Sequence, residues 1–130
     1  MSFQPQVLIV EDNRVNQIVL SKQLQKLGVT FAVTPSGPQA LEVWENSQDS
    51  ISVILMDVEI EGELNGLQVT SLIRKRQRET KRTRRPYVAI MTGRALEEDK
   101  QAAFDSGCDE FLVKPVPLEK IRQLLDVNLL

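Results

Sequence analysis

Residues suited to phosphate and metal chemistry directly follow four short apolar runs of this sequence. They are Glu11 and Asp12 after residues 7–10, Asp57 after 53–56, Thr92 after 87–91 and Lys114 after 111–113. If these runs are parallel strands of one sheet, three carboxylates, a hydroxyl and an ammonium group meet at the edge where such sheets bind ligands. Carboxylates at such short distances repel one another, so the cluster destabilises the fold unless the carboxylates share a cation.

The residue types in this group favour phosphoryl transfer. Oxygen ligands suit Mg²⁺ or Ca²⁺, and Mg²⁺ usually takes one or two carboxylates together with waters and a phosphate. Phosphoryl transfer depends mainly on positioning and on neutralising charge, which a lysine and a threonine beside the acids would serve. Taken singly, each residue has a simpler explanation, since an aspartate at a strand end commonly caps a helix. The hypothesis therefore depends on their joint occurrence.

Elements that could bring these residues together alternate regularly along the chain. The apolar runs are typical of strands buried on both faces, and the segments between them have apolar residues at helical spacing. The expected strands are residues 7–10, 30–34, 53–56, 87–91 and 111–113. The expected helices span 15–27, 36–44, 67 into a basic stretch, 96–106 and 117–125. A (βα)₅ order predicts a parallel sheet covered by helices on both faces.

Length and composition indicate one domain over residues 1–130. The apolar fraction of 42% and charged fraction of 26% are typical of soluble globular proteins. We see neither a signal peptide nor an apolar run near the roughly 18 residues of a membrane span, so no membrane contact is expected. Cys108 is the single cysteine and fits a cytoplasmic setting. The chain has no histidine, which excludes histidine-based catalysis and a phosphohistidine of its own.

Positive charge is concentrated in residues 74–85. Eight basic residues and one acid give this segment +7, so the remaining chain carries −9 within a net charge of −2. The basic residues are Arg74, Lys75, Arg76, Arg78, Lys81, Arg82, Arg84 and Arg85. The segment is interpreted as a solvated helix end and loop, as a docking surface for an acidic protein, or as a nucleic-acid contact. The acidic remainder and the absence of aromatic residues in the run argue against direct nucleic-acid binding.

Four motifs together resemble a known family. VLIVEDNRVNQ, ILMDV, AIMTGRAL and DEFLVKPV, in this order, are similar to the receiver domains of response regulators in two-component phosphorelay signalling. The resemblance covers residues 7–125 and is closest in style to receivers of hybrid histidine kinases. It implies a flavodoxin-like α/β fold with strand order 2-1-3-4-5. It also implies a phosphorylation switch, not an enzyme that acts on a separate substrate, with self-phosphorylation from a donor and autodephosphorylation as its only chemistry.

By this resemblance, Asp57 is the phosphoacceptor. Asp12 and Asp57 would be direct Mg²⁺ ligands, Glu11 would act through a metal-bound water, and the backbone carbonyl of Glu59 would complete the set, with Mn²⁺ as a possible substitute. The donor would be a histidine kinase or a histidine-phosphotransfer protein. The effector is an unknown protein, and the chain would be a monomer or a phosphorylation-dependent dimer.

The same resemblance implies the residues that sense the phosphoryl group. Thr92 and Lys114 would contact its oxygens, and Phe111 would be the aromatic side chain that rotates when Thr92 moves. The surface from the fourth helix to the fifth would then change shape. The peptide bond between Lys114 and Pro115 is expected to be cis.

Two departures from the family pattern follow the acceptor and the switch threonine. Ile60-Glu61 stands where such receivers have Met-Pro, and Gly66 lies nine residues beyond Asp57 instead of eight, which indicates one extra residue in the acidic loop. Gly93-Arg94 replaces the more familiar Ala-Asn. The ligand assignment survives these changes, while the loop geometry and the lifetime of the phosphoryl group are left open.

An aspartate-nucleophile phosphohydrolase is the alternative. Residues 55–59 faintly resemble the motif of haloacid dehalogenase enzymes. That motif closes the first strand of its fold, whereas Asp57 closes the third predicted strand. Glu59 and Glu61 also stand where that motif has Asp and Thr.

Overall fold

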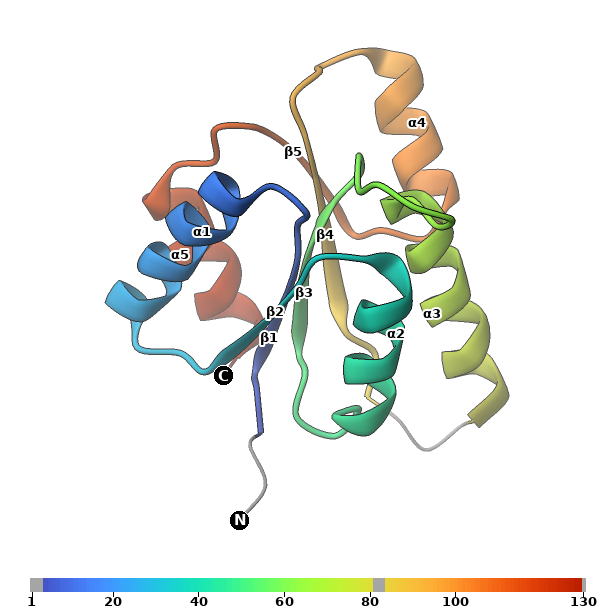
Figure 1. Ribbon diagram of the computed structural model, residues 1–130, viewed down its shortest axis with the longest axis horizontal. Coiled ribbons are helices and arrows are strands. Elements are labelled where there is room, and N and C mark those ends of the chain that lie inside the picture. Colours follow the sequence, from blue (N-terminus) through green and yellow to red (C-terminus); the bar gives the residue numbers. More distant parts are fainter. Residues whose placement is uncertain (1–3, 81–83, 130) are drawn as a thin grey trace.

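Five strands and five helices alternate along the chain in the computed structural model, which describes residues 4–80 and 84–129 (Figure 1). The strands are β1 (Val7–Val10), β2 (Phe31–Thr34), β3 (Val53–Asp57), β4 (Tyr87–Thr92) and β5 (Glu110–Val113). The helices are α1 (Arg14–Leu27), α2 (Gly37–Asn46), α3 (Gly66–Thr80), α4 (Glu97–Asp105) and α5 (Leu118–Asn128). Within these ranges no helix combines the length and apolar character that crossing a membrane requires.

The strands form one parallel sheet in the order β2-β1-β3-β4-β5, which confirms the predicted topology. β1 and β3 lie side by side in the middle, with Val10 opposite Met56. Every residue of both strands is buried, which explains why their sequences do not alternate between apolar and polar residues. The residues next to this pair, Glu11 and Asp57, consequently emerge together at the carboxyl edge of the sheet.

Helices cover the two faces of the sheet, with α2, α3 and α4 on one side and α1 and α5 on the other (Figure 1). Adjacent residues of β1 enter different layers: Leu8 packs in the core that includes Trp44 of α2, and Ile9 packs in the core that includes Leu24 of α1. Trp44 is completely buried. Burying each large side chain of this kind contributes about 1.5–3 kcal/mol, so both layers hold the sheet rigid beneath its carboxyl edge.

α1 begins directly after the acidic pair at the end of β1. Asn13 caps it, because its side chain accepts a hydrogen bond from the amide of Asn16 at 3.0 Å. Gly28 ends the helix with φ of 74°, the left-handed conformation that favours glycine. The short connection between a buried strand and a capped helix leaves Glu11 and Asp12 little conformational freedom.

Part of the basic segment is structural. Arg74 of α3 is only 7% exposed, and its guanidinium donates to the carbonyls of Gly107 (2.8 Å) and Pro86 (2.9 Å) and to Asp109 Oδ2 (2.8 Å). Burial lowers the pKa of Arg74, and the nearby Arg85 lowers it further, although Asp109 opposes this. The interpretation of the segment as solvated is therefore wrong for Arg74, which ties α3 to the loops that flank β4 and β5.

Most other basic residues of the segment lie at the surface. Arg76 pairs with Glu45 of α2, and Arg85 pairs with Asp109 Oδ1 at 2.7 Å. Lys75 and Arg78 are exposed on α3, as the solvated interpretation expects. Lys81 and Arg82 lie outside the described residues.

Candidate functional site

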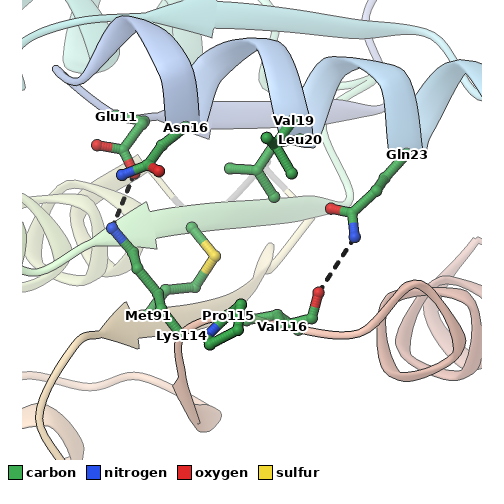
Figure 2. A pocket seen from close by; sticks show the side chains of 9 residues that line it. All are labelled: Glu11, Asn16, Val19, Leu20, Gln23, Met91, Lys114, Pro115 and Val116. Carbon is green, nitrogen blue, oxygen red and sulfur yellow. Dashed lines mark hydrogen bonds and ion pairs between the residues drawn. The ribbon is translucent and has the colours of Figure 1, made fainter.

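Lys114 joins two carboxylates at the carboxyl edge of the sheet. Its Nζ lies 2.8 Å from Glu11 Oε1 and 3.2 Å from Asp57 Oδ2 (Figure 2 shows the contact with Glu11). The backbone amide of Lys114 donates to the carbonyl of Thr92 at 2.7 Å, which fixes it beside the end of β4, and the Lys114–Pro115 peptide bond is cis. One ammonium group is thus shared between a residue that follows β1 and the last residue of β3.

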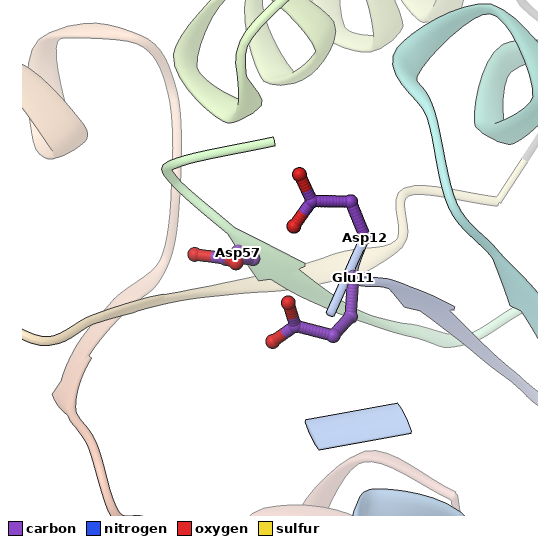
Figure 3. A group of neighbouring side chains, drawn as sticks. All are labelled: Glu11, Asp12 and Asp57. Carbon is purple, nitrogen blue, oxygen red and sulfur yellow. The ribbon is translucent and has the colours of Figure 1, made fainter. Parts of the chain in front are cut away.

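Three carboxylates from two neighbouring strand ends gather next to this lysine. Glu11, Asp12 and Asp57 each place a carboxylate oxygen within 4.8 Å of the others (Figure 3). Glu11 is fully buried and Asp57 is 5% exposed, whereas Asp12 is partly exposed. The predicted clustering of these acids, which depended on the strand order, is present.

Burial and mutual charge shape the ionisation of this group. Burial raises the pKa of Glu11, and Asp57 beside it raises it further, against the lowering effect of Lys114. Burial alone would lower the pKa of Lys114, but the hydrogen bond to Glu11 and the charge of Asp57 outweigh it, so the net shift is upward. Lys114 is consequently held as a cation between the two carboxylates.

Backbone amides of the acidic loop after β3 bind two of the carboxylates. The amide of Glu59 donates to Asp57 Oδ1 at 3.0 Å, and the amide of Glu61 donates to Asp12 Oδ2 at 2.9 Å. Gly62 follows with φ of 111°, so the longer loop turns immediately after it reaches Asp12. Asp12 is therefore held by the loop that the sequence marked as one residue longer than the family pattern.

Gly66 permits the close packing of this loop against the backbone of Asp57. Its amide donates to the carbonyl of Val58 at 3.1 Å, and an added Cβ would lie 2.3 Å from the carbonyl oxygen of Asp57. Backbone atoms cannot yield to such an overlap, so glycine is required at the start of α3. The extra residue is accommodated in the loop, and the contact of Gly66 with Asp57 is retained.

Thr92 and Phe111 line one cavity that reaches the loop after Asp57. Thr92 is 2% exposed, and its Oγ1 accepts a hydrogen bond from the amide of Arg94 at 3.2 Å. Phe111 is partly buried against the core. Both line a cavity of about 290 Å³ that also includes Glu59 and Asp99. The two predicted switch residues thus share a space into which a side chain can move.

The donor set suits a divalent cation. Three carboxylates against one ammonium leave a formal excess of two negative charges, and hard oxygen ligands are those that Mg²⁺ and Ca²⁺ take. Asp12 lies nearest to solvent and remains open to an ion, since a backbone amide occupies only its Oδ2. Glu59, whose expected contribution is its backbone carbonyl, lies in the loop directly after Asp57.

A second cavity flanks the site on the side of α1. It measures about 310 Å³ and lies between Leu20 and Gln23 of α1 and the segment from Lys114 to Val116 (Figure 2). Gln23 Nε2 donates to the carbonyl of Val116 at 3.1 Å, which ties α1 to the loop after β5. α1 also exposes three apolar side chains, Val15, Ile18 and Val19, of which Val19 lines this cavity.

Known proteins resemble this chain over nearly its whole length. The family model described as response regulator receiver domain matches residues 7–126. Hybrid signal transduction histidine kinase L of Dictyostelium discoideum is 35% identical over 122 residues. That match covers 92% of this chain and 7% of the kinase, so the chain spans a small part of the length of this relative.

Solved structures share the fold. The receiver domain of Pseudomonas aeruginosa sensor histidine kinase PA1611, solved with a magnesium ion coordinated in its active-site cleft, is 29% identical with a TM-score of 0.81, covering 96% of this chain and 97% of that chain. The co-crystal of the Saccharomyces cerevisiae histidine phosphotransfer protein Ypd1 with the Ssk1 receiver domain matches at 28% identity and a TM-score of 0.80. This second match covers 95% of this chain and 88% of that chain.

Proposed function

The chain belongs to the response regulator receiver domains of phosphorelay signalling, and we propose that it accepts a phosphoryl group on Asp57 from a phosphohistidine donor. The observation that carries this proposal is the contact of Lys114 with Asp57 Oδ2 inside the acidic cluster. The family match favours this function over the phosphohydrolase alternative, which needs the same aspartate.

Asp57 is the nucleophile of the proposed transfer. One of its carboxylate oxygens forms the new P–O bond while the P–N bond to the donor imidazole breaks, and the imidazole keeps the electron pair of that bond and takes up a proton. Lys114 stays beside the acceptor and offsets the charge that spreads over the phosphoryl oxygens. The hydroxyl of Thr92 donates to one of these oxygens once the phosphoryl group is in place.

Mg²⁺ is the cation we propose for this site, with Mn²⁺ as a substitute. Asp12 and Asp57 would hold it directly, Glu11 through a water, and Glu59 by its backbone carbonyl. When bound, the ion neutralises phosphoryl charge and brings the donor phosphate to the acceptor. The magnesium ion in the similar cleft of the PA1611 receiver supports this choice.

The protein acts as a switch and not as an enzyme with a separate substrate. Phosphorylation would move Thr92 and then Phe111, and the surface formed by α4, β5 and α5 would present a changed shape to a protein effector. The chain would form one receiver domain and work in the cytoplasm, either as a monomer or as a phosphorylation-dependent dimer.

A histidine kinase or a histidine-phosphotransfer protein would be the donor. The Ssk1 receiver forms a complex with the phosphotransfer protein Ypd1, and this supports a donor of the same kind here. α1 begins next to the site, and its exposed Val15, Ile18 and Val19 offer an apolar contact to such a partner.

Phosphorylation by acetyl phosphate tests the proposal. With Mg²⁺ the intact mass should rise by one phosphate, without a divalent cation it should not change, and Asp57→Asn should abolish the gain. Asp126→Asn, an exposed aspartate of α5, is the matched control and should be phosphorylated like the wild type. Modification of the Asp57→Asn variant at the normal rate would refute the acceptor, and rapid turnover of a small phosphomonoester would favour the phosphohydrolase.

A further inference from the structure

We propose that Arg94 is an additional phosphoryl-binding residue, which Asp99 of α4 holds away from Asp57 until the phosphoryl group competes for it. The inference rests on the proposed phosphorylation of Asp57. It assigns a role to the Gly93-Arg94 pair that departs from the family pattern.

Arg94 is engaged with α4 in the present state. Its Nη2 donates to Asp99 Oδ1 and Oδ2, both at 3.1 Å, and its Nε reaches Oδ2 at 3.3 Å. The Arg94 side chain is 60% exposed and that of Asp99 is 28% exposed, so this is a solvent-facing pair that a stronger anion can displace. The hydrogen bond and charge of Asp99 raise the pKa of Arg94, and the more distant Glu59 adds to this.

Arg94 shares a cavity with the loop that follows Asp57. Arg94, Asp99, Glu59 and Thr92 line the same cavity of about 290 Å³. The amide of Glu59 also donates to Asp57 Oδ1, so the cavity borders the loop that holds the acceptor carboxylate. Moving from Asp99 toward Asp57 would keep Arg94 along this cavity and would not require it to cross the packed core.

The backbone next to Arg94 is linked to Thr92. Gly93 separates the two residues, and apart from these two neighbours no atom of the described residues lies within 4 Å of where a Cβ of Gly93 would stand, so packing on that side does not hold the segment. The amide of Arg94 donates to Thr92 Oγ1 at 3.2 Å. If the Thr92 side chain rotates so that its oxygen moves toward the phosphoryl group, this hydrogen bond breaks and the Gly93-Arg94 segment is released at the same time.

The first turn of α4 has few other attachments. Within this helix only Ala103 is buried, and Leu96 at the N-cap position provides no side-chain hydrogen bond. A phosphoryl group carries about −1.5 to −2 charges and three acceptor oxygens, and therefore attracts a guanidinium more strongly than one carboxylate does. Loss of Arg94 leaves Asp99 near the positive N-terminus of its helix, which tolerates an unpaired acid. Because α4 has few other attachments, capture of Arg94 by the phosphoryl group would loosen this helix.

A double-mutant cycle on beryllofluoride affinity tests the competition. In the presence of Mg²⁺, Arg94→Gln should weaken binding of this phosphoryl analogue about two- to five-fold, and Asp99→Asn should strengthen it by a similar factor. Asp99→Asn should have no effect once Arg94 is glutamine, because the residue it releases is gone. If the ion pair were purely structural, both single variants would instead change the beryllofluoride affinity in the same direction.

Controls separate this inference from the proposed function. Arg122→Gln removes an exposed arginine that pairs with Glu119 and Asp126 on α5, and it should leave the affinity unchanged. The amide NMR shifts of residues 97–105 in Asp99→Asn should move part of the way toward those of the beryllofluoride-bound wild type. A wild type that binds no beryllofluoride refutes both proposals. If the wild type binds beryllofluoride normally but Arg94→Gln and Asp99→Asn do not change the affinity in opposite directions, only the proposed role of Arg94 is refuted.

Discussion

At the scale of single residues, Glu11 shows that keeping the acidic cluster charged is unfavourable for the folded protein without a cation. It is fully buried, and besides Lys114 its carboxylate is bound by the backbone amide of Asn13 at 3.2 Å. Burial raises its pKa, which means that the charged form is stabilised less in the folded protein than in the unfolded chain. A ligand that carries positive charge should therefore stabilise the folded protein by relieving this group.

Magnesium binding should be visible in thermal unfolding. We expect millimolar Mg²⁺ to raise the Tm of the wild type. At a Mg²⁺ concentration of 100 times Kd, the free energy of unfolding should increase by about 2.7 kcal/mol. Asp12→Asn should remove this effect, and its metal-free form should be at least as stable as the wild type because repulsion is reduced while the side-chain oxygen can still accept from Glu61. Asp49→Asn, an exposed aspartate, should keep the full response. Equal responses of Asp12→Asn and wild type would show that the ligands are wrongly assigned.

Cys108 should be unreactive at neutral pH. Burial raises the pKa of its thiol from 9.0 to about 11, and the neighbouring Asp109 acts in the same direction. Since the folded pKa is the higher one, the stability that the neutral thiol contributes is fully present below pH 9 and is lost as pH rises through 11. At pH 9 the thiolate fraction should be about 50-fold lower in the folded protein than in urea. Iodoacetamide labelling as a function of pH measures this thiolate fraction, and equal labelling rates in the folded and the urea-unfolded protein would contradict the burial of this thiol.

At the scale of elements, the sequence predicted the strands better than the connections between them. Unbroken apolar runs mark the buried strands, and all five strands, including the more exposed β2, were found within one residue of the expected limits. The loop after β3 was recognised as longer than usual, but its contact with Asp12 through the amide of Glu61 was not foreseeable. A backbone amide is the same in every residue type except proline, so the sequence carries no signal for this hydrogen bond.

The buried role of Arg74 was missed for a related reason. Its neighbours in the sequence are basic and exposed, and a charge pattern does not reveal which arginine of a run faces the core. Its position was still accessible in principle, because Ile73 and Arg74 follow Val69 and Thr70 at helical spacing on the buried side of α3. The partner, Asp109, lies 35 residues away and becomes a neighbour only in the folded sheet.

Replacing Arg74 should be strongly destabilising. Arg74→Leu removes hydrogen bonds to two carbonyls and to Asp109, and breaking such a buried pair typically costs about 3–5 kcal/mol. Arg76→Leu, which removes a surface pair with Glu45, should cost no more than about 1 kcal/mol. Urea unfolding of the two variants compares them directly. A loss below about 1 kcal/mol for Arg74→Leu would mean that this arginine does not hold α3 to the sheet.

At the scale of the whole molecule, the order β2-β1-β3-β4-β5 assembles the site. β1 and β3 are neighbours, so Glu11 and Asp57 meet; β4 and β5 follow on one side, so Thr92 and Lys114 arrive from that side. The strand order came from family resemblance, since alternating strands and helices alone do not specify it. Once it is given, the position of each residue at the end of its strand is sufficient to predict the cluster.

The same arrangement connects Asp57 on β3, through β4, to the edge strand β5. Thr92 is the last residue of β4, and Phe111 lies on β5 beside it, where Ile90 pairs with Phe111 and Thr92 with Val113. Moving the equilibrium between inactive and active forms from 1:99 to 99:1 requires about 5.5 kcal/mol. One hydroxyl hydrogen bond to a charged acceptor supplies about 1.5–3 kcal/mol of it. Lys114, the cation and the packing of Phe111 must provide the remainder, so a graded switch is expected.

Thr92→Ala tests whether the hydroxyl carries the signal to the surface of α4, β5 and α5. The variant keeps Asp57 and Lys114 and should still bind beryllofluoride, because the charge of the site is unchanged. The amide NMR shifts that beryllofluoride induces in residues 96–127 should be much smaller than in the wild type. Thr92→Ser, which retains the hydroxyl, is the matched control and should recover most of the response. If the alanine variant shows shifts of full size, the signal leaves the acceptor by a route that does not include Thr92, and the release of Arg94 becomes independent of it.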